Sequence, residues 1–338
     1  MNRRKKRLTL LLVVMTVLIT VFTGCGKNEQ SQEAATVAEK NAVKQIRIMA
    51  PNMYFPFIIA DEKGFFQEAF GDDTEVIFTI ADSGSAIMET MTSGEVEFAA
   101  LGDMPVIQAK ANGLDVKVIS SLFRSTSGYQ LIAAKDSGIK SISDLKGKRV
   151  AVMSGSTNHK LFLKYLDSEN LTENDMEVVY LKNKDQLAAF VANSVDAAVT
   201  QVPTSTTIEA KAGAYEVVDA NGYDDILTVI AGNNEYMKEN PKEAKAFLQA
   251  IFKATDWIEN NKEEAIQIVV DEMGDSYENV ELYYNTRTFE YSLDDSVKMA
   301  LEDTISYLYD QGTIKSEPKV EDIVDFTYLE ELGVNSDE

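Results

Sequence analysis

Cysteine and histidine are almost absent from this chain of 338 residues. Cys25 is the only cysteine, so the chain cannot close a disulfide within itself or gather several thiolates around a metal ion. His159 is the only histidine, and no serine or cysteine stands with it in a known catalytic arrangement. We therefore predict no catalytic residue, no metal site and no cofactor.

Basic residues are also scarce, because 32 Lys and Arg stand against 55 Asp and Glu. Five of the 32 lie within the first seven residues, so the rest of the chain has 27 basic and 55 acidic residues, a net charge of −28. Nucleic acids and anionic lipid surfaces are bound through basic surfaces. The charge balance argues against both as binding partners.

Long hydrophobic runs are lacking except at residues 8–22. This run follows the basic cluster 3–7 and ends at Thr23-Gly24-Cys25. A basic region, an apolar region and small residues in that order are typical of an export signal. No other segment reaches the roughly 18 apolar residues that a membrane span needs. The pattern predicts a signal peptide over residues 1–24, and an uncleaved transmembrane anchor is the alternative.

The end of this segment resembles the lipobox of bacterial lipoproteins, although Phe22 stands where that motif prefers leucine. The resemblance implies that the signal is cleaved, that Cys25 is acylated, and that no free thiol remains. The polar composition of residues 25–43 is typical of a flexible tether. We therefore expect a body held by lipid at the extracytoplasmic face of a bacterial cell membrane.

The remaining chain of roughly 295 residues is large for one core and favours two domains. Strand-like runs alternate with helical segments, in a first series at 46–49, 76–80, 98–101 and 116–119 and a second at 129–134, 148–152, 178–181 and 197–199, with a returning strand at 226–230. From residue 240 onward long helices dominate. This order predicts an α/β fold of two lobes, each a mostly parallel sheet flanked by helices. We assign residues 44–127 and 232–338 to lobe 1, and 128–231 to lobe 2.

Three loops combine a strand end, a turn of Gly, Ser, Asp or Thr, and a helix start: residues 81–85, 101–105 and 153–159. Helix N-termini present unpaired N–H groups and a partial positive charge, so they can bind anions. In open α/β sheets ligands lie beyond the carboxyl ends of the strands, where these loops fall. The pattern favours a small-anion site between the lobes, and simple helix capping is the alternative.

The loop motifs Asp82-Ser83-Gly84-Ser85, Gly102-Asp103-Met104-Pro105 and Gly155-Ser156-Thr157-Asn158-His159 occur together with Ser143-Asp144-Leu145-Lys146-Gly147 and Ser194-Val195-Asp196. In this order they resemble the solute-binding proteins of ABC importers for aliphatic sulfonates, taurine and nitrate, a group that includes thiamine-pyrimidine binders. The resemblance implies a type II periplasmic-binding-protein fold with a two-stranded hinge. It also implies a monomer without enzyme activity that delivers a small organic anion to a membrane permease and its cytoplasmic ATPase.

The resemblance carries ligand contacts onto matching positions. It implies polar donors and walls at Ser83, Gly84, Ser85, Gly102, Asp103, Ser156, Thr157 and His159, and apolar contacts at Tyr54 and Phe55. Gln201 stands in a loop where taurine-type relatives have tryptophan, and its amide could still hydrogen-bond a ligand. Asp103 is unfavourable beside an anion, so it either caps its helix or meets a ligand ammonium group. Arg124 is a further candidate anion partner, with an inter-strand or surface ion pair as the alternative.

An aliphatic sulfonate or taurine is the ligand that the resemblance favours. Nitrate or a thiamine-pyrimidine precursor in the same fold stays open, as does a sensor that serves no transporter. A pyrimidine-synthase-like enzyme is disfavoured, because such an enzyme uses a cysteine-rich iron motif and this chain has only Cys25.

Overall fold

The computed structural model describes residues 44–125 and 127–334. The predicted signal peptide, Cys25 and the predicted tether therefore lie outside the described residues. Within the described part of the chain, none of the helices combines the length and the apolar character that crossing a membrane requires.

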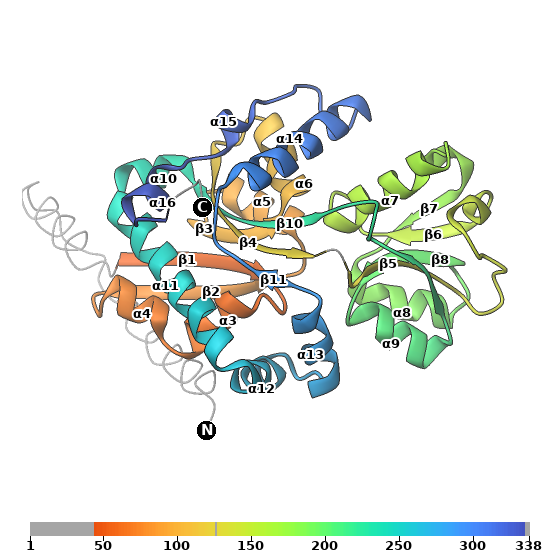
Figure 1. The fold of residues 1–338 in the computed structure, drawn as a ribbon, viewed down its shortest axis with the longest axis horizontal. Helices are drawn as coiled ribbons and strands as arrows, with labels where there is room; N and C mark the ends of the chain where they lie inside the picture. Colours follow the sequence, from red (N-terminus) through yellow and green to blue (C-terminus); the bar gives the residue numbers. More distant parts are fainter. Residues whose placement is uncertain (1–43, 126, 335–338) are drawn as a thin grey trace, which may run out of the picture. The chain divides into compact units, whose positions relative to one another are not determined.

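The described residues form two mixed β-sheets (Figure 1). The first has the strand order β11-β4-β10-β3-β1-β2, and its strands are β1 (Lys44–Pro51), β2 (Thr74–Ala81), β3 (Phe98–Gly102), β4 (Val116–Ser125), β10 (Ile226–Asn233) and β11 (Thr288–Phe289). Strands β1, β2 and β3 pair in parallel, whereas β10 runs antiparallel to both β3 and β4. The carboxyl ends of β1, β2 and β3 consequently meet at one edge.

The second sheet has the order β7-β6-β8-β5-β9, with β5 (Tyr129–Ala133), β6 (Arg149–Val152), β7 (Glu177–Tyr180), β8 (Ala197–Gln201) and β9 (Tyr215–Asp219). Strands β6, β7 and β8 pair in parallel, and β5 runs antiparallel to β8 and β9. The predicted α/β architecture is confirmed, but the sheets are mixed and not mostly parallel, since five of the nine strand pairs in the described residues are antiparallel. Strands β9 and β11 were not predicted, the first because its side chains are only partly buried and give no clear apolar run, and the second because it has two residues.

Two chain segments connect the sheets. The chain leaves the first sheet after β4 and enters the second at β5, and it returns after β9 to enter β10. Strand β10 pairs with β3 and β4 along its length, so the returning strand belongs by its hydrogen bonds to the first sheet. The predicted lobe boundary at residue 231 therefore falls inside β10.

Helices cover both faces of each sheet (Figure 1). With the first sheet lie α3 (Phe55–Glu62), α4 (Phe65–Phe70), α5 (Gly84–Thr92), α6 (Asp103–Ala111), α10 (Asn234–Glu239), α11 (Pro241–Asn260), α12 (Lys262–Met273), α13 (Tyr277–Asn285), α14 (Asp295–Asp310), α15 (Val320–Ile323) and α16 (Thr327–Glu331). With the second lie α7 (Thr157–Ser168), α8 (Asn183–Val191) and α9 (Thr204–Ala212). Helix α11 packs on α3 and α4, and α14 packs on α6, so the C-terminal helices complete the first sheet's layers.

Apolar spacing explains this packing. Strand β1 buries alternate residues, and α11 buries Phe247, Leu248, Ile251 and Ile258 along one stripe, as a helix period of 3.6 requires. Phe247 stacks on Phe98 of β3 with ring centroids 4.4 Å apart. In the second sheet, α7 joins one apolar cluster while α8 and α9 join another, so each face has its own core. The sheets are thereby fixed, and the loops at their edges are free to form a site.

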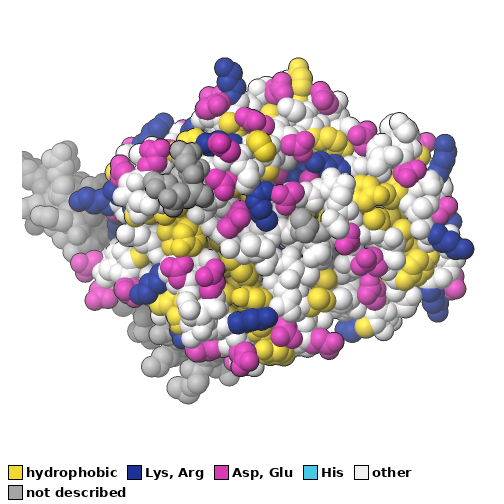
Figure 2. Space-filling view, viewed as in Figure 1, with side chains coloured by type: hydrophobic (Ala, Val, Ile, Leu, Met, Phe, Trp, Pro, Cys, Tyr) yellow, Lys and Arg dark blue, Asp and Glu magenta, His cyan; other side chains and the backbone are white. Residues whose placement is uncertain are grey.

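The surface carries the excess acidic charge. Figure 2 shows Asp and Glu side chains spread over the described part of the visible face, with Lys and Arg placed among them. In this view the basic side chains are not gathered into one continuous patch.

Candidate functional site

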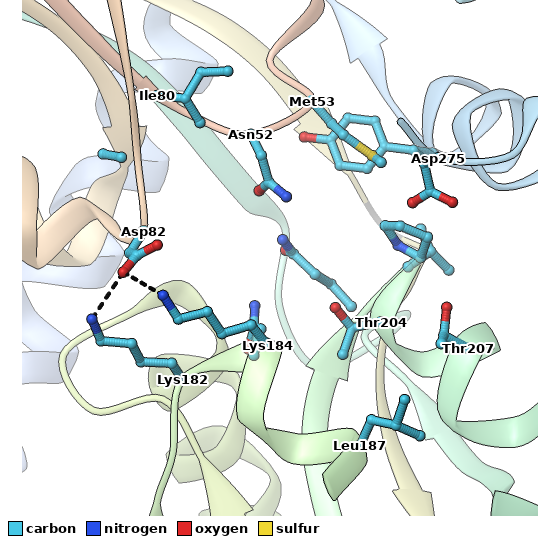
Figure 3. A pocket seen from close by; sticks show the side chains of 16 residues that line it. Asn52, Met53, Ile80, Asp82, Lys182, Lys184, Leu187, Thr204, Thr207 and Asp275 are labelled. Carbon is cyan, nitrogen blue, oxygen red and sulfur yellow. Dashed lines mark hydrogen bonds and ion pairs between the residues drawn. The ribbon is translucent and has the colours of Figure 1, made fainter. Parts of the chain in front are cut away.

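A cleft lies between elements of the two sheets and contains two adjoining cavities. The larger, of about 330 Å³, is drawn in Figure 3, and the smaller has about 50 Å³. They share Asn52, Asp82, Asn183 and Gln201 in their walls. Asn52 and Asp82 follow strands of the first sheet, whereas Asn183 and Gln201 belong to elements of the second. The cleft can thus contact a ligand from both sides.

Seven of the predicted site residues line the smaller cavity: Tyr54, Ser83, Gly84, Gly102, Ser156, Thr157 and Gln201. They come together because β2, β3 and β6 end at the cleft and each is followed by a helix start. A Cβ placed on Gly102 would lie 2.1 Å from Oγ1 of Thr157, so glycine at this position lets the two sides approach closely.

Ser83 and Ser156 act as helix caps. The Oγ of Ser83 accepts from the N–H of Ala86 at 3.2 Å, and the Oγ of Ser156 accepts from the N–H of His159 at 3.3 Å. The first N–H groups of α5 and α7 have no acceptor within their own helices. Each serine can therefore cap its helix and still belong to the site. Its side chain fixes the first turn of the helix, and the smaller cavity lies beside that same turn.

Phe55 and Ser85, both predicted to contact ligand, line neither cavity of the cleft. Phe55 is fully buried as the first residue of α3 and stacks on Tyr283, with ring centroids 6.3 Å apart. Ser85 donates from Oγ to the carbonyl oxygen of Gly155 at 3.0 Å and so joins the two sides of the cleft. Its hydroxyl is engaged in holding the lobes together.

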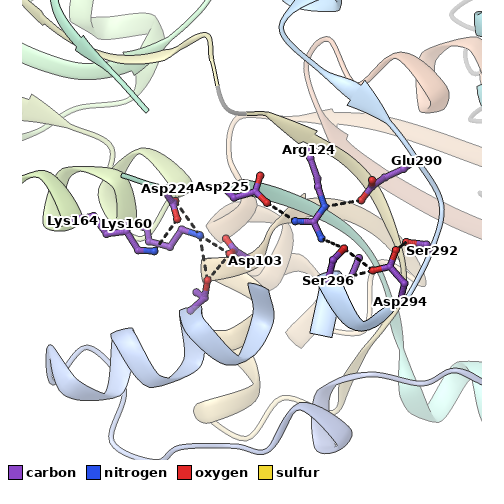
Figure 4. A network of polar contacts seen from close by, with 12 residues as sticks. Asp103, Arg124, Lys160, Lys164, Asp224, Asp225, Glu290, Ser292, Asp294 and Ser296 are labelled. Atoms are coloured by element: carbon purple, nitrogen blue, oxygen red, sulfur yellow. Dashed lines mark hydrogen bonds and ion pairs between the residues drawn. The ribbon is translucent and has the colours of Figure 1, made fainter. Parts of the chain in front are cut away.

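Asp103 has a partner that neither predicted alternative included. It is fully buried, and its Oδ2 lies 2.6 Å from Nζ of Lys160 on α7 and accepts from Oγ1 of Thr304 at 2.7 Å (Figure 4). Its Oδ1 accepts from the N–H of Met104 at 2.7 Å. The carboxylate is thus enclosed by cationic and neutral donors, and it occupies the start of α6 that a ligand anion would otherwise use.

Lys160 continues this buried network. Its Nζ is 3.1 Å from Asp224, and Lys164 bridges Asp224 and Asp303 at 2.9 Å each (Figure 4). Burial by itself lowers the pKa of Lys160, but the charges of Asp103 and Asp224 outweigh it and raise that pKa above its ordinary value. The lysine is charged, and the ion pair with Asp103 joins α6 of the first lobe to α7 of the second.

His159, also predicted to contact ligand, lines neither cavity. Its Nδ1 accepts from the N–H of Gly155 at 3.2 Å, which leaves the ring proton on Nε2, 3.1 Å from Oε1 of Glu173. The imidazole therefore holds the turn before α7. Arg124 is likewise engaged, with Asp225 at 2.5 Å and Glu290 at 3.1 Å (Figure 4), which is the inter-strand alternative considered for it.

At the mouth of the larger cavity, Asp82 accepts from Lys182 at 2.9 Å and from Lys184 at 2.8 Å (Figure 3). Hydrogen bonds from Lys184 and Lys182 lower the pKa of Asp82 below its usual range. These exposed pairs cross the cleft, because the lysines flank the start of α8. An incoming anion would compete with Asp82 for them.

Five residues that line the cleft were not predicted from the sequence: Asn52, Tyr129, Lys182, Asn183 and Lys184. Nor was a role predicted for Arg287, which lies between α13 and β11 against Tyr283 of the cleft wall. One feature of the sequence could have drawn attention to Arg287, because it is the only basic residue within 263–297.

Comparison with known proteins places these features in a family. A relative from Bacillus subtilis (strain 168), whose name assigns it to aliphatic sulfonate binding, is 28% identical over 323 residues, covering 94% of this chain and 95% of its own length. A relative from Escherichia coli (strain K12) with the same assignment is 23% identical over 238 residues, covering 70% of this chain and 74% of its own.

Among solved structures, the alkanesulfonate-binding protein SsuA of Xanthomonas axonopodis pv. citri, bound to MOPS, superposes with a TM-score of 0.76 at 21% sequence identity. The superposition covers 83% of this chain and 98% of that one, and it confirms the predicted periplasmic-binding-protein fold. The family described as NMT1/THI5 like matches residues 52–265, which is more than half of the sequence. The chain belongs to the NMT1/THI5-like family, as its loop motifs indicated.

Proposed function

We propose that this protein is the solute-binding component of an ABC importer and that it captures a small organic anion in the cleft. One observation carries the proposal. Helices α5 and α7, one from each lobe, both begin at the smaller cavity, and four polar residues line both this cavity and the larger one. Helix starts and amides favour an anionic or strongly polar head. The sulfonate-binding relatives support an aliphatic sulfonate or taurine as cargo.

The mechanism is capture by lobe closure. A ligand that contacts both lobes binds the closed form more tightly than the open form, so it shifts the population toward closure. We assign residues 44–127 and 232–338 to lobe 1 and 128–231 to lobe 2, except that residues 226–231 of β10 pair with β3 and β4 and so go with lobe 1. The closed form is then the state that the permease recognises.

We further propose that residues 1–24 are a cleaved signal, that Cys25 carries lipid, and that residues 25–43 tether the body to the outer side of the cell membrane. In this account the protein is a monomer without catalytic activity, and its partners are the ligand, a permease and a cytoplasmic ATPase. Mass spectrometry of the protein recovered from bacterial membranes tests the lipid: a diacylglyceryl adduct on Cys25 supports it, and an intact residue 1 contradicts it.

Thermal unfolding of the full-length protein against ethanesulfonate, longer alkanesulfonates, taurine, nitrate and the thiamine pyrimidine tests the ligand class. A ligand at 100 times its dissociation constant stabilises the folded state by about 2.7 kcal/mol. For a protein of this size that raises the midpoint by several degrees. A shift with sulfonates or taurine supports the proposal. A shift with nitrate or the pyrimidine alone transfers the cargo to that class, and no shift with any of them contradicts it.

A further inference from the structure

Arg287 is a buried guanidinium between α13 and β11, beside tyrosine rings of the cleft wall. Its side chain is 93% buried, since only 7% of its surface is exposed. Nη1 donates to the carbonyl oxygen of Tyr283 at 3.1 Å and contacts Oγ1 of Thr286. Neither Nε nor Nη2 pairs with a carboxylate or forms a hydrogen bond of good geometry among the described residues, although the guanidinium interacts with the hydroxyls of Tyr129 and Tyr283. These two nitrogens form one edge of the guanidinium, the edge that can donate two parallel hydrogen bonds.

An edge without a carboxylate partner is exceptional for this protein. Arg47, Arg124 and Arg149, the other arginines of the described ranges, each form an ion pair with a carboxylate. Arg287 has none within those ranges. A buried charge without a counter-charge is costly. Such a cost is tolerated at positions where a bound partner supplies the missing charge.

The rings around Arg287 are those of the cleft wall. Its guanidinium carbon lies 3.5 Å from the ring centre of Tyr283 and 5.3 Å from that of Tyr129. Tyr283 lines the larger cavity, and Tyr129 lines the smaller one together with Tyr54. Arg287 itself lines neither cavity, so a ligand can reach its Nε–Nη2 edge only past these rings. Tyr129 is the first residue of β5 in the second sheet. A movement of the two lobes apart would therefore carry this ring away from Arg287.

The tyrosines remain hydrogen-bond donors in this setting. Burial raises the pKa of Tyr54, Tyr129 and Tyr283, and the charge of Arg287 offsets this only in part. The phenols are therefore neutral near pH 7 and can donate from their hydroxyl groups. A guanidinium surrounded by neutral donors matches a head with several acceptor oxygens.

We propose that the Nε–Nη2 edge of Arg287 binds the anionic head of the ligand beside these rings of the cleft wall, with the hydroxyls of Tyr54 and Tyr129 as further donors. This inference rests on the proposed function, because it takes the cleft as the ligand site. Two oxygens on one atom, as in sulfonate, phosphonate or carboxylate, accept the two parallel bonds. The tail then extends into the larger cavity, where Met53, Ile80 and Leu187 supply apolar contacts.

Calorimetric titration of the full-length protein tests this inference. The probes are butanesulfonate, butylphosphonate, pentanoate and the neutral butanesulfonamide, titrated into wild type, Arg287→Lys and Arg287→Met. Arg149→Met is the matched control, because Arg149 is paired with Asp196 outside the cleft. We expect wild type to bind at least one of the anions and to reject the sulfonamide. Arg287→Met should weaken anion binding at least about 100-fold, Arg287→Lys should weaken it less, and the control should leave it unchanged.

Unfolding of the ligand-free variants separates binding from a structural role. Removal of an unpaired buried charge should leave the thermal midpoint of Arg287→Met equal to or above that of wild type. Anion affinity within threefold of wild type in Arg287→Met overturns the inference while the proposed function stands. A lower midpoint in the ligand-free variant also overturns it, because Arg287 is then structural. If wild type binds the sulfonamide and none of the anions, both the inference and the proposed function fall.

Discussion

Replacing Lys160 with methionine should destabilise the protein more than replacement of any exposed lysine. The variant leaves the carboxylate of Asp103 fully buried with only two neutral donors, the N–H of Met104 and Oγ1 of Thr304. Breaking a buried ion pair by removing one partner costs about 3–5 kcal/mol. Native domains have a total of about 5–15 kcal/mol, so the expected loss is a large share of the stability.

Urea unfolding measures this loss as the difference in free energy of unfolding. Lys253→Met is the matched control, because Lys253 pairs with Glu68 at the surface and such pairs contribute about 0–1 kcal/mol. The double variant Lys160→Met with Asp103→Leu removes both charges of the Asp103–Lys160 pair and leaves Asp224 with Lys164, so it should be less destabilised than Lys160→Met alone. A loss in Lys160→Met no larger than that of the control would refute the reasoning.

The pH dependence of this effect follows from the raised pKa of Lys160. A group whose pKa is higher in the folded than in the unfolded state contributes stability that is fully present below its unfolded value, here 10.5, and is lost as the pH rises through the folded value. The penalty of Lys160→Met should therefore be the same at pH 6 and pH 9. A penalty that disappears between these values would mean that Lys160 is neutral in the folded protein.

Two further variants test the contacts across the cleft. Ser85→Ala removes the hydrogen bond to Gly155, worth about 1 kcal/mol, so ligand affinity measured by calorimetry should fall about fivefold and not be abolished; complete loss would return Ser85 to direct ligand contact. Asp82→Asn frees Lys182 and Lys184, so anion affinity should rise and depend more steeply on salt, while urea unfolding changes little; weaker anion binding in this variant would contradict competition between Asp82 and the ligand.

The sequence was informative about the fold because its signals are local. Short apolar runs such as 46–49 and 98–101 are bounded by turn residues, and their alternation with helices indicates an α/β fold with parallel pairs such as β1 with β2. The antiparallel pairing of β10 with β3 and β4 depends on long-range contacts and was not predicted. Strand β9 was not predicted from the sequence because Tyr215 and its neighbours are only partly buried. Phe55 was expected to contact ligand, but it is the first residue of α3, whose start the sequence pattern around Pro56 did not indicate.

The site was predictable where it depends on topology and not where it depends on long-range pairing. Ser83, Gly102 and Thr157 line one cavity because parallel strands place their carboxyl ends at the same edge. Asp103 and Lys160 are 57 positions apart, and no local pattern indicates that they meet. Arg287 acquires its surroundings only when α13, β11 and β5 are assembled, so its role could not be inferred from its neighbours in the sequence.

The central claim is that the cleft between the two lobes binds an organic anion. A crystal structure of the full-length protein with the panel ligand that gives the largest thermal shift tests this most directly. The account predicts the anionic head beside Tyr54 and Tyr129, within hydrogen-bond distance of Arg287, with both lobes in contact with the ligand. Density for the ligand outside the cleft would contradict this claim, and density inside it with the head directed away from Arg287 would overturn only the inference about Arg287.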